Sequence, residues 1–164
     1  RLGFDYCSDG RGTCPHLPVW NAELVRCPQL PTTLPTLDEL IGRDGITPEN
    51  VAAHLLQLTR QANATGHVYT LHAELEGQRL APVFEQLLTG WKAHGWRLVS
   101  TRTLYESLQP MALPRCEVGP GEISGRGGKL LVQGGEFLAD VDLESRKIDL
   151  LRASHTGSRR RRRR

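Results

Sequence analysis

A short segment near the middle of the chain, residues 67–75, has the pattern of a buried β-strand that ends in polar groups. Side chains alternate between the two faces of a strand, and apolar side chains fall on both faces of this one. Strands of this kind are typical of the interior of an α/β protein. His72 and Glu74 lie toward the carboxyl end, where α/β barrels place their catalytic groups. The pattern therefore predicts an α/β fold with a candidate site at the end of this strand.

An amphipathic helix is predicted to follow, since apolar residues recur at steps of three and four from Leu80 to Trp91 and Gly95 ends the pattern. Residues 96–100 then predict a second strand, and residues 103–108 a short helix. The order strand, helix, strand, helix is the unit of a parallel sheet with right-handed crossovers. The chain offers too few such strands to close a sheet, so we expect that a piece of the domain is missing.

The amino-terminal third of the chain predicts short elements. Residues 2–6 and 23–27 have the composition of short strands. Residues 36–41 begin with a capping box, a Thr followed three residues later by a Glu, which predicts one or two turns of helix. Residues 47–63 begin with Thr and Pro, the residue types preferred at a helix start, and predict a second helix.

The carboxyl-terminal part loses this periodicity beyond Pro110, where glycine-rich sequences predict loops without phosphate-binding spacing. Residues 137–151 predict a frayed helix, and the six arginines at 159–164 predict a disordered tail. Such a tail could bind nucleic acid or anionic lipid. However, the rest of the chain has 15 basic against 18 acidic residues, so we expect no specific nucleic-acid partner.

The four cysteines form no Cys-x-x-Cys pair and match no zinc-binding spacing. We expect four reduced thiols, as in a cytosolic protein, and one disulfide between Cys7 and Cys14 in a shared loop stays open as the alternative. No run of residues is long enough to span a membrane, and we expect no signal peptide. Because the chain starts at Arg1 inside an apolar segment, we expect a fragment of a longer protein.

Three blocks carry a resemblance, at residues 7–12 (CSDGRG), 30–44 (LPTTLPTLDELIGRD) and 68–77 (VYTLHAELEG). In these blocks, and in their order, the chain resembles the polysaccharide deacetylase (NodB-homology) family, and within it the 4-deoxy-4-formamido-L-arabinose-phosphoundecaprenol deformylases. The resemblance divides the chain into residues 1–133, similar to the carboxyl-terminal part of such a domain, and residues 134–164, an unassigned extension that ends in the arginine tail.

The resemblance implies a partial (β/α) barrel of the NodB type whose amino-terminal strands are missing. It also implies a hydrolase that removes an N-formyl or N-acetyl group from an aminosugar, here undecaprenyl-phosphate-linked 4-formamido-arabinose in lipid A modification. In this family a divalent metal activates the attacking water, an Asp acts as base and a His protonates the leaving nitrogen.

Four residues match positions with a function in that group. His72, in the Thr-Leu-His motif at 70–72, matches the general acid, and Asp9, Arg11 and Glu74 match residues that line the substrate cleft. Residues 1–133, which carry the resemblance, contain neither the family's Asp-x-Asp nor its His-x-x-x-His metal motif. The resemblance therefore implies that no residue of this chain is a metal ligand and that the chain alone is inactive.

The implied partner is a lipid-linked aminosugar, which suggests a cytoplasmic protein in peripheral contact with the bacterial inner membrane. An open half-barrel exposes sheet edges and apolar surface, so self-association is also expected. The alternative function is a non-catalytic binding or interaction module with an arginine-rich tail. The upstream coding sequence distinguishes the two, because an Asp-x-Asp segment and a His-x-x-x-His there would support the enzyme.

Overall fold

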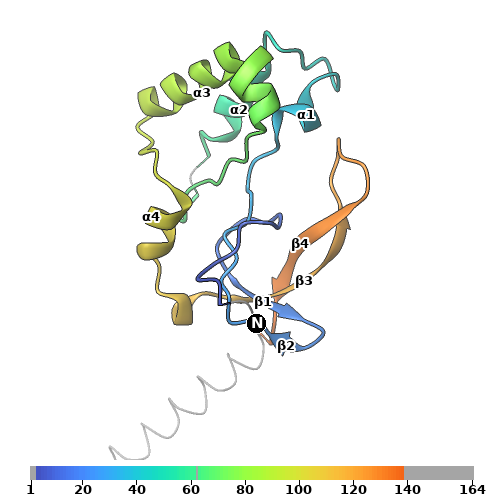
Figure 1. Ribbon diagram of the computed structural model, residues 1–164, viewed down its shortest axis with the longest axis vertical. Helices are drawn as coiled ribbons and strands as arrows, with labels where there is room; N and C mark the ends of the chain where they lie inside the picture. Colours follow the sequence, from blue (N-terminus) through green and yellow to red (C-terminus); the bar gives the residue numbers. More distant parts are fainter. Residues whose placement is uncertain (1–2, 62, 139–164) are drawn as a thin grey trace, which may run out of the picture.

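The structure, a computed structural model, describes residues 3–61 and 63–138. These residues form a mixed α/β fold with an open, four-stranded mixed sheet at one end (Figure 1). The strand order is β2-β1-β3-β4, with β1 parallel to β3 and the other two pairs antiparallel. The strands are β1 (Leu17–Trp20), β2 (Glu23–Leu24), β3 (Arg115–Glu122) and β4 (Lys129–Glu136).

The helices gather mostly at the opposite end of the molecule. Helices α1, α2 and α3 lie together there, α4 lies beside the connection that returns to the sheet, and the β3–β4 hairpin reaches back toward α1 (Figure 1). A π-helical turn directly precedes α3, and a short 3₁₀ turn follows α4. These elements are α1 (Leu37–Leu40), α2 (Val51–Leu58), the π turn (Leu75–Arg79), α3 (Ala81–Ala93), α4 (Thr101–Glu106) and the 3₁₀ turn (Pro110–Ala112).

The hydrophobic core lies among the helices. The predicted amphipathic face of α3 is confirmed, because Val83, Leu87 and Trp91 are buried at helical spacing and Gly95, at φ 85°, follows the helix end. The buried side chains of this core come from α1, α2, α3 and the residues beside them: Leu34, Leu37, Val51, Ala52, Leu55, Leu80, Val83, Leu87 and Trp91.

The helix starts agree with the sequence in part. The Glu39 half of the predicted capping box is present, because the Thr36 amide donates to Glu39 Oε2 at 3.0 Å. Helix α2 begins at Val51 rather than Thr47 and ends at Leu58, although the Val51 amide already bonds to the Thr47 carbonyl at 3.0 Å. Helix α4 starts two residues earlier than predicted and ends at Glu106.

The strands predicted at residues 67–75 and 96–100 are wrong. Residues 67–72 are extended but form no strand, and helical turns begin at Ala73; residues 96–100 are also outside any strand. A strand requires a ladder of hydrogen bonds to a neighbour. Here the single backbone pairing is the Thr33 amide donating to the Val68 carbonyl at 3.0 Å, so the extended segments have no strand to pair with among the described residues.

The glycine-rich region predicted as loop is instead the β3–β4 hairpin, with its turn at residues 123–128. The amino-terminal strands are also corrected: residues 3–6 form none, and the segment predicted at 23–27 contributes only β2. Of the helix predicted at 137–151, residues 137 and 138 form a turn and the remainder lies outside the described residues, as does the arginine run at 159–164.

The four cysteines are all free thiols, as expected. Cys7 lies beside Cys27, with the two Sγ atoms 3.4 Å apart, rather than beside Cys14, its partner in the alternative that was left open. Burial, the hydrogen bond to Cys7 and the nearby negative charges raise the pKa of Cys27 to about 11. A thiol with so high a pKa is a poor nucleophile at neutral pH, so Cys27 has a packing role near neutrality.

Candidate functional site

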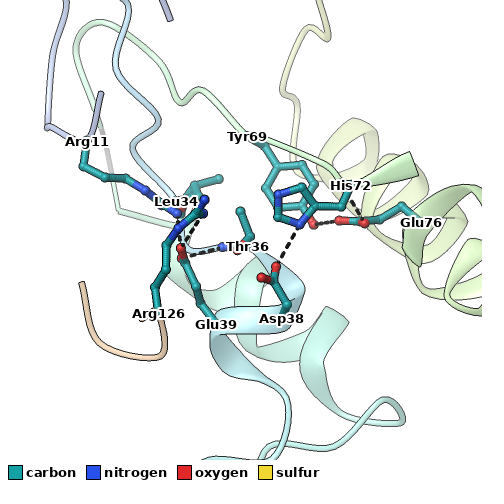
Figure 2. A network of polar contacts seen from close by, with 9 residues as sticks. All are labelled: Arg11, Leu34, Thr36, Asp38, Glu39, Tyr69, His72, Glu76 and Arg126. Atoms are coloured by element: carbon teal, nitrogen blue, oxygen red, sulfur yellow. Dashed lines mark hydrogen bonds and ion pairs between the residues drawn. The ribbon is translucent and has the colours of Figure 1, made fainter. Parts of the chain in front are cut away.

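His72 lies where the extended segment 67–72 ends and the helical turns before α3 begin. Its Nδ1 is 3.0 Å from Oδ1 of Asp38, which projects from the short helix α1 (Figure 2). On the backbone side, the His72 amide donates to Oε2 of Glu76 at 3.0 Å. The imidazole is therefore oriented by the Asp38 carboxylate, while Glu76 holds the His72 backbone.

The charge of Asp38 determines which nitrogen of His72 carries the shared proton. Burial disfavours the charged form, but the Thr36 side chain, the Asp38 backbone amide and the neighbouring His72 together hold the pKa of Asp38 below its ordinary value. Asp38 is thus a carboxylate near neutral pH, and a carboxylate can only accept a hydrogen bond. The proton of the contact lies on His72 Nδ1, which leaves Nε2 to exchange a proton with a ligand.

Tyr69 and Glu76 support the backbone around His72. The Tyr69 hydroxyl donates to Oε1 of the buried Glu76 at 2.7 Å, while the other oxygen of Glu76 accepts from the His72 amide (Figure 2). Burial, together with the hydrogen bond and charge of Glu76, raises the pKa of Tyr69 well above its ordinary value. Tyr69 therefore stays protonated and acts as a permanent donor that holds this turn in place.

Arg11 lies on the other side of α1, in a second polar network. Its Nη2 pairs with Oε1 of Glu39 and its Nη1 donates to the Leu34 carbonyl at 2.7 Å. The Glu39 side chain is only 1% exposed, and Nη1 of Arg126 from the hairpin turn lies 3.5 Å from the same oxygen. Because Asp38 and Glu39 are neighbours in sequence, α1 joins the Arg11 network to the His72 contact (Figure 2).

The other two predicted site residues are exposed. Asp9 accepts a hydrogen bond from Nε2 of Gln29 at 2.6 Å, and its amide donates to Oε1 of the same side chain at 3.2 Å. Glu74 lies on the exposed side of the helical turn after His72. The structure thus brings His72 to Asp38 and Glu76, and places Asp9, Arg11 and Glu74 outside that immediate contact; their roles at the substrate stay predictions.

Sequence reasoning missed Asp38, Tyr69 and Glu76. The strand interpretation put Glu74 on the face of His72, because side chains two apart share a face of a strand. In a helical turn the residue four positions on takes that place, which is Glu76. The order His-x-x-x-Glu was visible in the sequence and would have indicated this contact, whereas nothing local predicted that Asp38 would meet His72.

In the part of the chain that the structure describes, no three His, Cys, Asp or Glu side chains lie close enough together to hold a metal ion. His72 and Asp38 give two donors, and the nearby Glu76 is already engaged by Tyr69 and by the His72 amide. The described residues therefore do not fit a divalent metal site. None of the helices in the described ranges has the length and apolar character needed to cross a membrane.

Comparison with known proteins finds partial relatives. The chain is 39% identical over 131 residues to the probable 4-deoxy-4-formamido-L-arabinose-phosphoundecaprenol deformylase ArnD of Shewanella sediminis (strain HAW-EB3), a match that covers 79% of this chain and 40% of that protein. The protein with the same description from Wigglesworthia glossinidia brevipalpis is 36% identical over 89 residues, 54% of this chain and 30% of that protein. No protein-family profile matches the sequence. The chain thus spans less than half the length of either relative.

Proposed function

Because this chain is a partial-length relative of the ArnD deformylases, we propose that it supplies the proton-donating part of a hydrolase that removes an N-formyl or N-acetyl group from an aminosugar. The names of both relatives make 4-formamido-arabinose linked to phosphoundecaprenol the proposed substrate. The observation that carries the proposal is the contact between His72 Nδ1 and the Asp38 carboxylate.

Hydrolysis of an amide needs a proton at the nitrogen that leaves. Water adds to the carbonyl carbon, the carbon–nitrogen bond breaks, and the amine departs only if its nitrogen is protonated as the bond cleaves. In the proposal, His72 Nε2 delivers this proton while Nδ1–H stays hydrogen-bonded to Asp38. The hydrogen bond to Asp38 fixes the ring, so that Nε2 keeps one direction.

The predicted substrate-binding residues enter the proposal in two ways. Asp9 and Glu74 are exposed carboxylates that could accept hydrogen bonds from sugar hydroxyls. Arg11 already has its guanidinium on Glu39, so it would reach a substrate only by exchanging that buried partner. We therefore assign Arg11 a positioning role: it holds α1, and α1 holds Asp38 against His72.

The family resemblance implies a divalent metal, and the described residues do not fit one. We accordingly assign these residues proton delivery and not the activation of water. In the same proposal residues 1–133 are a segment of a NodB-type (β/α) barrel, and residues 134–164 are an extension. A substrate with a polyprenyl anchor would bring the protein to the cytoplasmic face of the bacterial inner membrane, as a peripheral contact.

The test is a chimera in which the matched 131 residues of the Shewanella relative are replaced by the aligned residues of this chain. Release of formate from the formamido-arabinose lipid is measured for the chimera and for its His72→Ala and Gln78→Ala variants. General acid catalysis contributes ~10²–10⁴-fold, so His72→Ala should lose that much activity. Gln78→Ala, at an exposed position of the same turn, should lose none.

The pH profile separates a proton donor from a structural residue. If His72 is the acid, the activity of the chimera should fall toward high pH, because a general acid must carry its proton, and His72→Ala should remove this dependence on pH. An inactive chimera, or a His72→Ala loss of less than about tenfold, would contradict the role.

A further inference from the structure

Two of the four thiols are in direct contact, although they lie 20 positions apart in the sequence. The Sγ atoms of Cys7 and Cys27 are 3.4 Å apart, and both side chains are partly exposed. A disulfide has a sulfur–sulfur bond of about 2.05 Å, so the two atoms would have to approach each other by only about 1.4 Å. The two thiols therefore lie close to the geometry of a disulfide while both are still reduced.

The backbone around this contact is already held in place. The Cys7 amide donates to the Pro28 carbonyl at 2.9 Å, and the Cys7 carbonyl accepts from the Leu30 amide at 2.8 Å. The Ser8 hydroxyl adds a hydrogen bond of 2.7 Å to the Leu30 carbonyl. These bonds fix residue 7 against the segment that follows Cys27, so the two sulfurs stay neighbours and their local concentration is high.

The proton of the contact lies on Cys27. Because the pKa of Cys27 is raised to about 11 by burial, by the hydrogen bond to Cys7 and by nearby negative charges, this thiol keeps its proton near neutral pH. Its S–H therefore donates to Cys7 Sγ. A thiolate reacts with oxidants and a thiol hardly does, and a donated hydrogen bond stabilises the thiolate. Cys7 is thus the sulfur that reacts first.

The other two thiols are arranged differently. Gln133 Nε2 donates to Sγ of Cys14 and to Sγ of Cys116, at 3.3 Å in each case, so one amide engages both sulfurs. Cys116 is only 4% exposed, and burial raises its pKa, which makes it a poor target for an oxidant. Cys14 and Cys116 therefore provide a comparison within the same chain.

We propose that Cys7 and Cys27 form a peroxide-sensitive modification site, at which hydrogen peroxide converts the two thiols into a reversible disulfide. In the first step the Cys7 thiolate attacks one oxygen of the peroxide and the oxygen–oxygen bond breaks. The hydroxide that leaves takes up the proton that Cys7 had released and becomes water. Cys7 is then a sulfenic acid.

In the second step the Cys27 sulfur attacks the Cys7 sulfur. The sulfur–sulfur bond forms, the sulfur–oxygen bond breaks, and the departing hydroxide takes the Cys27 proton to give a second water. Two thiols and one hydrogen peroxide thus give one disulfide and two waters. The two sulfurs lose two electrons, and the peroxide gains them.

The first step favours the second. Burial is the largest cause of the high pKa of Cys27 and remains, but two further causes, a hydrogen bond and a charge, come from Cys7 itself. The charge is lost when Cys7 becomes a neutral sulfenic acid, so Cys27 then gives up its proton more easily. Cys27 is therefore unreactive in the reduced protein and becomes a nucleophile after Cys7 has been oxidised.

The surroundings of the pair favour a small, uncharged oxidant. Asp5 and Asp9 are among the negative charges that act on Cys27, and they oppose the approach of an anionic oxidant such as glutathione disulfide. Hydrogen peroxide carries no charge and needs little space. The disulfide would close a loop that includes Asp9 and Arg11, and it would restrict the unfolded chain, so the oxidised protein should be the more stable form.

The experiment treats the purified, reduced 164-residue chain with hydrogen peroxide and then removes the peroxide with catalase. Free thiols are counted, and the disulfide is located by mass spectrometry of proteolytic peptides. We expect the count to fall from four to two, with Cys7 joined to Cys27, and dithiothreitol to restore all four. The melting temperature of the oxidised form should be higher by roughly 5 °C or more. An unchanged count, or an oxidised form that melts no higher, would overturn the proposal.

Three serine variants test the pair and the order of the steps. Cys27→Ser should form no disulfide and should accumulate a sulfenic acid at Cys7, which dimedone traps as a stable adduct. Cys7→Ser should give less than about a tenth of that adduct at Cys27, because Cys27 keeps its proton. Cys14→Ser is the matched control and should form the disulfide as the parent does.

Other products would assign the oxidation elsewhere, and each overturns the proposal. A main disulfide between Cys14 and Cys116 would show that contact between the sulfurs does not select the pair. A disulfide between two copies of the chain would show that Cys7 and Cys27 do not meet within one molecule. A sulfinic acid at Cys7 that dithiothreitol does not reverse would show that Cys27 fails to react with the oxidised sulfur.

Discussion

At the scale of single residues, one carboxylate holds the site together. Glu39 is buried in α1 and accepts from the Thr36 amide while it pairs with Arg11 and lies near Arg126. Two buried charges of opposite sign offset each other's desolvation only while both are present. The neighbouring residue Asp38 contacts His72, so we expect that removal of the Glu39 carboxylate also disturbs this contact.

Glu39→Ala should therefore lower the free energy of unfolding by about 3–5 kcal/mol, because it leaves the Arg11 guanidinium buried without its partner. Arg126→Ala is the matched control: its side chain is 38% exposed, and an exposed ion pair contributes about 1 kcal/mol or less. Urea denaturation of the three proteins measures both effects. Equal losses in the two variants would contradict the central role of the Arg11–Glu39 pair.

The pH dependence of stability should report the state of Asp38. A carboxyl whose pKa is lower in the folded than in the unfolded chain contributes stability above its unfolded value, here 3.8, and this contribution is lost as the pH falls through the folded value. Asp38→Asn should accordingly be less stable than the parent at pH 6, and the difference should shrink as the pH falls below 3.8 and vanish only below the folded pKa of Asp38. Asp44→Asn, at an exposed turn position, controls for the general loss of a negative charge. A difference that stays constant with pH would show that the Asp38 charge is not stabilised by folding.

At the scale of elements, local signals predicted helices better than strands. The periodicity of α3 and the capping box of α1 depend on residues close in sequence, and both were found. Residues 67–75 have strand composition, yet a strand exists only beside a partner, and none of the described residues provides one. At the site, the resemblance pointed to His72, whereas the contact with Asp38 joins segments 34 positions apart and was not predicted.

At the β3–β4 hairpin the error was the opposite one: its glycines and proline led to a predicted loop where the structure has two strands. Pro120 cannot donate to a ladder and usually argues against a central strand. It is tolerated because β1 pairs with β3 only over residues 115–117, so at Pro120 the strand has β4 on one side and no neighbour on the other in the described structure. The apolar run at 130–132 after a glycine-rich turn is the signal that would have indicated the hairpin.

The hairpin turn should depend on Gly125. Its φ of 92° is in the region that favours glycine, and a Cβ there would overlap the Glu39 carbonyl on α1. Gly125→Ala is expected to cost about 1–3 kcal/mol, from backbone strain and from displacement of the turn. Gly127→Ala, where a Cβ would meet no atom within 4 Å, should be close to neutral. Thermal unfolding compares the two, and similar melting temperatures would show that the turn does not pack on α1.

At the scale of the whole molecule, the described residues provide a candidate proton donor but no group of side chains that could hold a metal. The contact of His72 with Asp38 can orient this proton donor. The chain also corresponds to 40% of the Shewanella relative's length. In the proposed function, the groups that activate the water therefore lie outside the described residues.

The isolated 164-residue chain should therefore show no metal-dependent release of formate from the formamido-arabinose lipid. The assay adds zinc, manganese or cobalt ions in turn and compares formate release with a chelator-treated blank; the full-length Shewanella relative serves as the positive control. We expect the isolated chain to match the blank with every ion, because proton delivery by His72 cannot replace the activation of water. Formate release by the isolated chain that a chelator abolishes would show that this chain binds the metal itself. The assignment of proton delivery alone to its described residues would then be wrong.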